Sequence, residues 1–309
     1  MSARELIVLG TASQAPTRLR AHNGYVLRWD DQLILFDPGE GAQRQCLLAG
    51  VAVARLTAVC ITHFHGDHCL GLPGIIQRRA LDARSSGGSL PPLPVFHPGD
   101  GAVYLERMRG SSIYHDTSNL DPRPIEGPGP VAAIGGLELR ADELDHRVTT
   151  FGYRLTEPDG IRLDPQRLSE RGLAGPDVGR LVAQGWLDTS VGRVDLDEVS
   201  GPRPGQSMAF VMDTAVCPAI GRLADGVDLA VFESTYLEEH RQLAADYRHL
   251  TAGQAGRLAA DAGVRRLLLS HFSARYPEPG VFAAEASAHH PDVVEASDLV
   301  TVEVPPRRP

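Results

Sequence analysis

A short segment dense in metal-ligating side chains, Thr62–His68, constrains the fold of this chain more than any other feature. It holds three histidines and one aspartate: His63, His65, Asp67 and His68. The segment directly follows the apolar run at 56–61, which is typical of a buried strand that ends in a metal-binding loop. Imidazole nitrogen and carboxylate oxygen suit zinc and similar cations. A solvated turn that merely contains histidines is the alternative, but the pattern H-x-H-x-D-H is far more specific than a histidine pair.

The composition is that of a globular protein with one large or two ordinary domains, since 42% of the 309 residues are hydrophobic. The formal net charge is −9, so no overall positive field attracts nucleic acid. This argues only mildly against a nucleic-acid substrate, because the local charge can differ. All 30 cationic residues are arginines, so every phosphate contact would use a planar guanidinium with several donors.

The cysteines and the hydropathy pattern favour a cytoplasmic protein. None of Cys46, Cys60, Cys69 and Cys217 forms a C-x-x-C pair, and we interpret all four as reduced, small apolar residues. Cys69 as a metal ligand is the alternative, because it lies beside the histidine loop. The sequence shows neither a secretory signal nor an apolar run long enough to span a membrane.

Apolar runs and turn residues predict many short strands and a few definite helices. Strands are expected at residues 5–9, 25–29, 33–36, 56–61, 151–155, 208–212, 229–232 and 266–269, and helices after the turn at 37–41 to about 49, at 75–83 and at 252–262. Residues 93–150 alternate strands with Pro/Gly turns. This pattern predicts one α/β domain of two packed sheets with helices outside.

One stretch breaks this rhythm. Residues 158–205 are rich in Gly, Pro, Asp and Arg and have little apolar periodicity. An irregular stretch of this length inside a compact domain is uncommon and is usually functional or mobile. We therefore expect a flexible insert that projects from a single domain spanning 1–309.

Three further candidate ligands follow apolar strands elsewhere in the chain: His146, Asp213 and His271. Each alone is more often an ordinary polar residue at a strand end. Together with the four ligands of the first loop they number seven, which suits two metals that share one carboxylate. Five further histidines have no ligand-like setting and are interpreted as surface or packing residues: His97, His115, His240, His289 and His290.

Over nearly its whole length the chain resembles the metallo-β-lactamase superfamily and, within it, the ribonuclease Z family of tRNA 3′-processing endonucleases. The histidine loop alone indicates only the superfamily. The more specific resemblance depends on further segments: 9–11, 16–20, 36–40, 71–74, 151–154, 233–236, 249–251 and 270–276.

This resemblance implies an αββα sandwich of two mixed sheets with outer helices, and two Zn²⁺ per subunit. It places His63, His65, His146 and Asp213 on one zinc and Asp67, His68, Asp213 and His271 on the other. It also implies a homodimer whose projecting arm grips precursor tRNA through a Gly-Pro motif, here Gly175 and Pro176, with Arg180 as a candidate phosphate contact. The arm is weakly basic, because residues 160–200 hold five arginines and seven acidic residues.

The expected reaction is hydrolysis of a phosphodiester after the discriminator base. Metal binding activates water for attack, and Asp67 is the candidate general base. From the residues alone, His249 is more often a surface histidine at a helix start. The resemblance makes it the proton donor to the leaving ribose oxygen, oriented by Glu233. Arg275 is a candidate phosphate contact or a structural ion-pair partner. Arg18 and Arg20 are candidates for contact with the RNA 3′ end, in a loop that lacks the family's asparagine directly after Arg20.

Two other function classes remain open at this point. One is a metallo-hydrolase of the same fold that acts on a small phosphodiester, a sulfate ester or a thioester. The other is a non-catalytic RNA-binding protein on a hydrolase fold, which the seven clustered ligands disfavour because such a cluster is costly to bury without a metal.

Overall fold

The computed structural model describes residues 4–85, 87–190 and 192–307, and the chain divides into two compact units. The first unit runs to Thr156 and resumes at Ser207–Pro306, and the second holds Glu157–Gln206. Among the described residues, no helix has both the length and the apolar character needed to cross a membrane.

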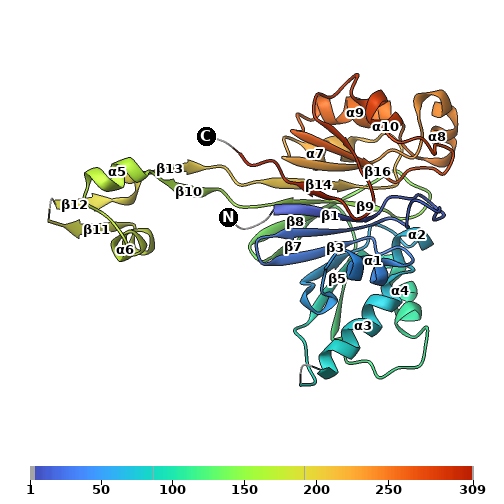
Figure 1. Ribbon diagram of the computed structural model, residues 1–309, viewed down its shortest axis with the longest axis horizontal. Coiled ribbons are helices and arrows are strands. Elements are labelled where there is room, and N and C mark those ends of the chain that lie inside the picture. Colours follow the sequence, from blue (N-terminus) through green and yellow to red (C-terminus); the bar gives the residue numbers. More distant parts are fainter. Residues whose placement is uncertain (1–3, 86, 191, 308–309) are drawn as a thin grey trace. The chain divides into compact units, whose positions relative to one another are not determined.

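The first unit is built on two mixed sheets of seven strands each (Figure 1). The first sheet has the order β18 (Thr301–Glu303), β1 (Arg4–Gly10), β2 (Gly24–Trp29), β3 (Gln32–Phe36), β4 (Ala58–Cys60), β5 (Leu93–Pro98) and β6 (Leu120–Ile125). Strands β1, β2 and β3 pair antiparallel, and β3 to β6 pair parallel. The expected hairpin turns at Asp30, which takes a positive φ of 57°.

The second sheet has the order β17 (Val293–Glu295), β16 (Arg266–Ser270), β15 (Leu229–Glu233), β14 (Ser207–Val211), β9 (Phe151–Thr156), β8 (Leu137–Glu143) and β7 (Gly129–Ile134). Its strands β14 to β17 pair parallel, and the remaining pairs are antiparallel. The carboxyl ends of β14, β15 and β16 therefore lie at one edge, which positions the site.

Alternation along strand β1 shows how the layers are held together. Leu6 and Val8 belong to the core between the two sheets, whereas Ile7 and Leu9 belong to the core under the outer helices. Successive side chains of a strand point to opposite faces, so a run that is buried on both faces is apolar throughout.

Helices cover the outer face of each sheet (Figure 1). The first sheet packs against α1 (Ala42–Leu48), α3 (Leu72–Ser85) and α4 (Ala102–Arg109), and the second against α7 (Pro218–Ala224), α9 (Ala252–Asp261) and α10 (Val281–Ala286). Short elements complete the unit: α2 (Gly66–Cys69), α8 (Arg241–Tyr247), η1 (Val53–Arg55), η2 (Gly99–Gly101) and η4 (Glu238–His240). The αββα sandwich implied by the resemblance is confirmed.

The second unit corrects the expectation of an irregular stretch at 158–205. Its elements are β10 (Gly160–Leu163) paired with β13 (Ser200–Arg203), β11 (Trp186–Thr189) paired with β12 (Gly192–Asp195), α5 (Pro165–Glu170), α6 (Pro176–Gln184) and η3 (Leu196–Val199). Its buried apolar residues form a separate small core: Leu168, Leu173, Leu181, Leu187, Val194 and Val199. The elements are too short for periodicity to reveal them. The helix starts at Asp164-Pro165 and Gly175-Pro176 were the available signals.

Candidate metal centre

The seven candidate ligands meet at the carboxyl ends of strands from both sheets. His63 and His65 follow β4, Asp67 and His68 lie in α2, and His146 follows β8. Asp213 and His271 follow β14 and β16. These residues form two groups. Each residue of a group offers one ligand atom, and these atoms lie within 4.8 Å of one another. One group is His63, His65, His146 and Asp213, and the other is Asp67, His68 and His271.

The two carboxylate oxygens of Asp213 face different groups. Asp213 Oδ2 lies 3.7 Å from His63 Nε2 and 3.7 Å from His146 Nε2. Asp213 Oδ1 lies 3.2 Å from His68 Nε2 and 3.2 Å from His271 Nε2. One carboxylate thus stands between two sets of nitrogen donors, as a bridging ligand of two cations would.

The buried polar atoms of this centre fit a divalent metal. Among the described residues, Asp213 Oδ1 and His146 Nε2 are buried side-chain atoms without a hydrogen-bond partner. Leaving such atoms unpaired is costly, and a cation would satisfy both. Burial lowers the pKa of His63, His65 and His146, so these imidazoles stay neutral and keep a lone pair for a metal.

The ring nitrogens that face away from the centre are held by acceptors. His68 Nδ1 lies 2.8 Å from Asp37 Oδ2, His146 Nδ1 lies 3.1 Å from the Arg248 carbonyl, and His271 Nδ1 lies 2.9 Å from Thr235 Oγ1. These contacts fix each ring orientation and present Nε2 to the centre, an arrangement typical of metal-binding histidines.

Asp37 contacts a candidate ligand and is a residue of the site that the sequence analysis missed. Its fully buried carboxylate also accepts hydrogen bonds from Thr62 N and Thr62 Oγ1, both at 2.7 Å, and so ties the first ligand loop to the end of β3. Like His146, Asp213 and His271, it comes directly after an apolar strand, which was the available signal. Asp37, Asp213 and His271 all have positive φ, at 42°, 43° and 61°. This uncommon conformation turns the chain sharply where each strand ends.

His249 and Glu233 form a pair beside the metal ligands. His249 Nδ1 lies 2.9 Å from Glu233 Oε1, and Glu233, at the end of β15, is fully buried. Burial alone would lower the pKa of His249, but the Glu233 carboxylate outweighs burial and raises that pKa to about 9. Burial opposes ionisation of Glu233, yet His249 keeps its pKa below the ordinary value. The pair is therefore a carboxylate and a protonated imidazole at neutral pH.

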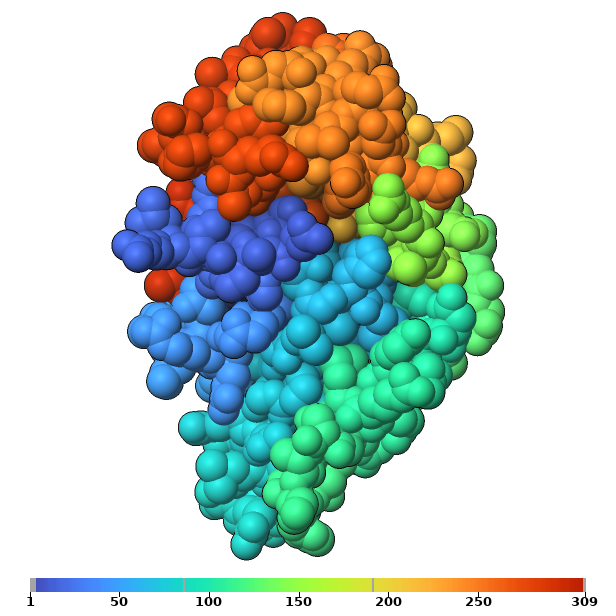
Figure 2. All heavy atoms as spheres, turned by 90° about the vertical axis from the view of Figure 1, so that its right-hand side faces the viewer, coloured from blue at the N-terminus to red at the C-terminus, as the bar shows by residue number. Residues whose placement is uncertain are grey.

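A cleft of about 560 Å³ opens onto this centre and contains several of the predicted residues. It is lined by Asp67, His249 and Arg275, and Asp67 Oδ2 accepts a hydrogen bond from Gln14 N at 2.7 Å. Figure 2 looks onto the face where the dark-blue N-terminal segment meets the orange segment of the C-terminal half.

Five of the predicted substrate contacts lie apart from the centre or in the second unit. Arg18 is exposed but does not line the cleft, and the Arg20 guanidinium lies 4.7 Å from the Phe272 ring centroid and 4.0 Å from Glu295 Oε1. Gly175 and Pro176 begin α6 of the second unit. In the same helix Arg180 is paired with Asp177 at 2.5 Å.

Cys69 does not join the ligands. Its thiol donates a hydrogen bond to the His65 carbonyl at 3.2 Å, and burial raises its pKa to about 12. The other cysteines within the described ranges are free as expected. His97 and His290 are buried packing residues, in agreement with their interpretation.

Comparisons with known proteins agree over the full chain. The profile of the metallo-beta-lactamase superfamily matches residues 17–158, and that of the beta-lactamase superfamily domain matches residues 198–272. Ribonuclease Z of Salinispora arenicola is 55% identical over 309 residues, covering 100% of this chain and 98% of the relative. Ribonuclease Z of Streptomyces coelicolor is 52% identical over 310 residues, covering 100% of both chains.

Solved structures support the fold alone. The metallo-beta-lactamase fold protein YhfI from Bacillus subtilis aligns with a TM-score of 0.70 at 17% identity, covering 98% of this chain and 100% of that protein. Human tRNase Z, short form, aligns with a TM-score of 0.66 at 20% identity, covering 97% of this chain and 99% of that protein.

Proposed function

This chain belongs to the ribonuclease Z family of metal-dependent endoribonucleases with the metallo-β-lactamase fold, and we propose that it removes the 3′ trailer of precursor tRNA by cutting after the discriminator base. We further propose that two zinc ions serve the reaction. The observation that carries the proposal is the position of Asp213, whose two oxygens face two separate sets of histidine nitrogens.

These distances support a proposed set of ligands for each of the two proposed zinc ions. His63, His65, His146 and Asp213 would hold one ion, and Asp67, His68, His271 and Asp213 the other. Two bound zinc ions would supply Lewis acidity that activates water and neutralises the charge developing on the phosphate oxygens. Nitrogen and oxygen donors in this number fit zinc better than magnesium, which prefers oxygen ligands.

The protein's own residues would handle the protons. Asp67 lines the cleft and would accept the proton of the attacking water as general base. Water would add to phosphorus while the bond from phosphorus to the ribose O3′ breaks, and the O3′ would take the proton of His249. Glu233 would keep His249 protonated until that moment. Arg275 lines the same cleft and would contact a phosphate.

The second unit, Glu157–Gln206, would serve as an exosite arm that binds tRNA. Five of its arginines are already paired with carboxylates of the same unit: Arg167, Arg171, Arg180, Arg193 and Arg203. Exposed Arg162 and the backbone around Gly175 and Pro176 would then make the first phosphate contacts.

We also propose that the protein acts as a homodimer in the cytoplasm. Helices α1 and α3 contact each other and carry Leu47, Leu48 and Leu81 with exposed fractions of 75%, 52% and 56%. Exposed leucines on neighbouring helices are typical of a surface that another copy covers. Light scattering of the purified protein tests this part.

The direct test of the function is incubation of the zinc-loaded protein with a 3′-extended tRNA, followed by mapping of the cut. We expect one cut after the discriminator base that leaves a 3′ hydroxyl on the tRNA. A protein that hydrolyses bis(4-nitrophenyl) phosphate but leaves the RNA uncut would contradict the substrate assignment. It would favour a small-molecule hydrolase of the same fold.

A further inference from the structure

A second cavity shares a wall with the cleft at the metal centre. It has a volume of about 680 Å³, within the range of small-ligand sites. His65, His146 and Arg147 line both cavities, so two metal ligands stand between them. A phosphodiester held at the centre would therefore have one cavity on each side.

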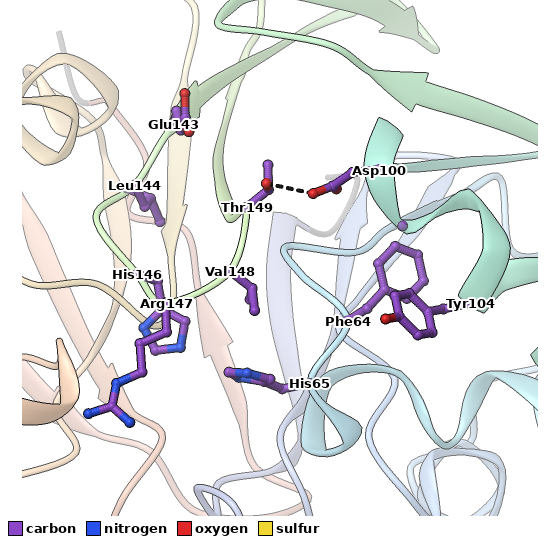
Figure 3. A pocket seen from close by; sticks show the side chains of 11 residues that line it. Phe64, His65, Asp100, Tyr104, Glu143, Leu144, His146, Arg147, Val148 and Thr149 are labelled. Atoms are coloured by element: carbon purple, nitrogen blue, oxygen red, sulfur yellow. Dashed lines mark hydrogen bonds between the residues drawn. The ribbon is translucent and has the colours of Figure 1, made fainter.

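Aromatic rings form one side of this second cavity. The rings of Phe64 and Tyr104 lie opposite His146 and Arg147 (Figure 3), and their centroids are 5.8 Å apart at an interplanar angle of 34°. Tyr104 is 49% exposed although it is a large ring, and the Arg107 guanidinium lies 5.6 Å from its centroid. Such rings are suitable platforms for a nucleobase, because every base has a π face.

The position of Phe64 is fixed by its surroundings. A Cβ at Gly101 would lie 2.0 Å from the Phe64 ring, so only glycine allows the ring to pack against this backbone. The His97 ring meets Phe64 edge-on with centroids 5.8 Å apart. Phe64 lies between His63 and His65 in sequence, so the platform is attached directly to the metal loop.

The charges of the cavity favour a base over a phosphate. Asp100 and Glu143 line it, and Arg147 is the cation that lines it. Asp100 Oδ2 accepts a hydrogen bond from Thr149 Oγ1 at 2.7 Å, which links η2 to the loop after β8 (Figure 3). Two carboxylates beside one guanidinium disfavour an anion and accept hydrogen bonds from base edges.

The position of His249 decides which nucleotide this is. His249 lines the first cleft and does not line the second cavity. As donor to the leaving O3′, it places the discriminator nucleotide in the first cleft. In in-line attack, water and the leaving O3′ lie on opposite sides of phosphorus, so the O5′ of the trailer, which stays bonded to phosphorus, points away from that line. We infer that the second cavity binds the base of the first trailer nucleotide, stacked on Tyr104 and Phe64; this inference rests on the proposed function.

The test compares two precursor tRNAs that differ only at the first trailer position, one with a normal base and one with an abasic ribose. We expect wild type to cleave the normal RNA with a kcat/KM roughly 5- to 150-fold higher, the effect typical of one stacked base. In Tyr104→Ala this ratio should fall close to one. Tyr104→Phe keeps the ring and should keep the ratio.

Val103→Ala is the matched control, because Val103 lies on the same helix, is also 49% exposed and does not line the cavity. It should keep the wild-type ratio. An unchanged ratio in Tyr104→Ala, or equal cleavage of both RNAs by wild type, would overturn the inference while the proposed function stands. Failure of wild type to cut either RNA would overturn the proposed function and this inference with it.

Discussion

His249 Nδ1 lies 2.9 Å from Glu233 Oε1, and this contact places a protonated imidazole beside the metal ligands at neutral pH. Glu233 also accepts a hydrogen bond from Thr214 N at 2.8 Å and another from Thr235 Oγ1 at 2.7 Å. Thr214 follows the candidate ligand Asp213, and Thr235 contacts the candidate ligand His271 at 2.9 Å. One buried carboxylate therefore connects the proposed proton donor to the candidate metal centre.

The first prediction concerns His249 itself. His249→Ala should keep its metals and lose ~10²–10⁴-fold in turnover of precursor tRNA, the usual contribution of a general acid. The loss should be much smaller for bis(4-nitrophenyl) phosphate, since nitrophenolate leaves without a proton. Steady-state kinetics on both substrates measure this difference. Equal losses on the two would contradict the donor role.

The second prediction concerns pH. A donor acts only while protonated, so the activity on precursor tRNA should fall as the pH rises through the His249 pKa of about 9. Glu233→Gln removes the carboxylate that raises this pKa, so the alkaline limb should move to lower pH. The pH dependence of kcat shows the shift, and the metal content of the variant is the control. If the alkaline limb of the variant lies at the same pH as that of wild type, the limb reports the titration of a group other than His249.

The third prediction concerns the bridging carboxylate. Asp213 has a φ of 43°, a conformation that asparagine tolerates better than alanine, so Asp213→Asn is the suitable change. It removes the negative charge shared by both ligand groups. We expect loss of one metal or both, and of most activity, measured by elemental analysis and by kinetics. Full metal content with normal turnover would exclude a dinuclear centre that depends on Asp213.

Much of the candidate metal centre was predictable from the sequence, because most of the candidate ligands come after the end of a strand, although Asp67 and His68 lie in α2. His63, His146 and His271 illustrate this rule. Their approach to one another depends on strand order, such as the parallel pairing of β15 with β16, which one sequence does not reveal. Asp37 was missed because Asp-Pro-Gly is also an ordinary turn. Its role arises only when β4 pairs with β3 and brings Thr62 and His68 beside it.

The helices and strands of the second unit could not be predicted by the same means. Leu168, Leu181 and Val194 are buried in the small core of this unit, in elements too short to show a period. These helices and strands form because of a local apolar core and because two helices begin at a proline, and an analysis of periodicity detects neither feature.

The fourth prediction follows from Asp37. Asp37→Asn keeps the shape of the side chain but makes it a weaker hydrogen-bond acceptor. In the wild-type protein, Asp37 Oδ2 lies 2.8 Å from His68 Nδ1. Removal of such an outer hydrogen bond typically lowers metal affinity ~10–100-fold. Competition with a zinc chelator measures the affinity. Asp31→Asn is a control, because this aspartate lies in the exposed turn between β2 and β3. Equal affinities in wild type and Asp37→Asn would leave Asp37 with a purely structural role.

The fifth prediction separates binding from chemistry. Leu163 pairs with Ser200 at the end of the β10–β13 ladder, so residues 164–199 can be replaced by an Asn-Gly turn that closes the hairpin. The shortened protein should keep its metals and its hydrolysis of bis(4-nitrophenyl) phosphate, because all seven ligands lie in the first unit. Cleavage of precursor tRNA should fall steeply through KM. The logarithmic salt dependence should flatten by about one unit for each arginine–phosphate interaction that the deletion removes.

A point variant checks whether the fold of the second unit matters for this binding. Leu181 is fully buried in that unit's small core, and Leu→Ala at such a site typically costs ~2–5 kcal/mol. Only six buried residues form that core among the described residues, so Leu181→Ala should unfold the unit. The variant keeps every arginine, yet it should lose most of the tRNA cleavage that the shortened protein loses. If the shortened protein processes tRNA at full efficiency, the main tRNA contacts lie in the first unit, where Arg18, Arg78 and Arg275 would be the next positions to change.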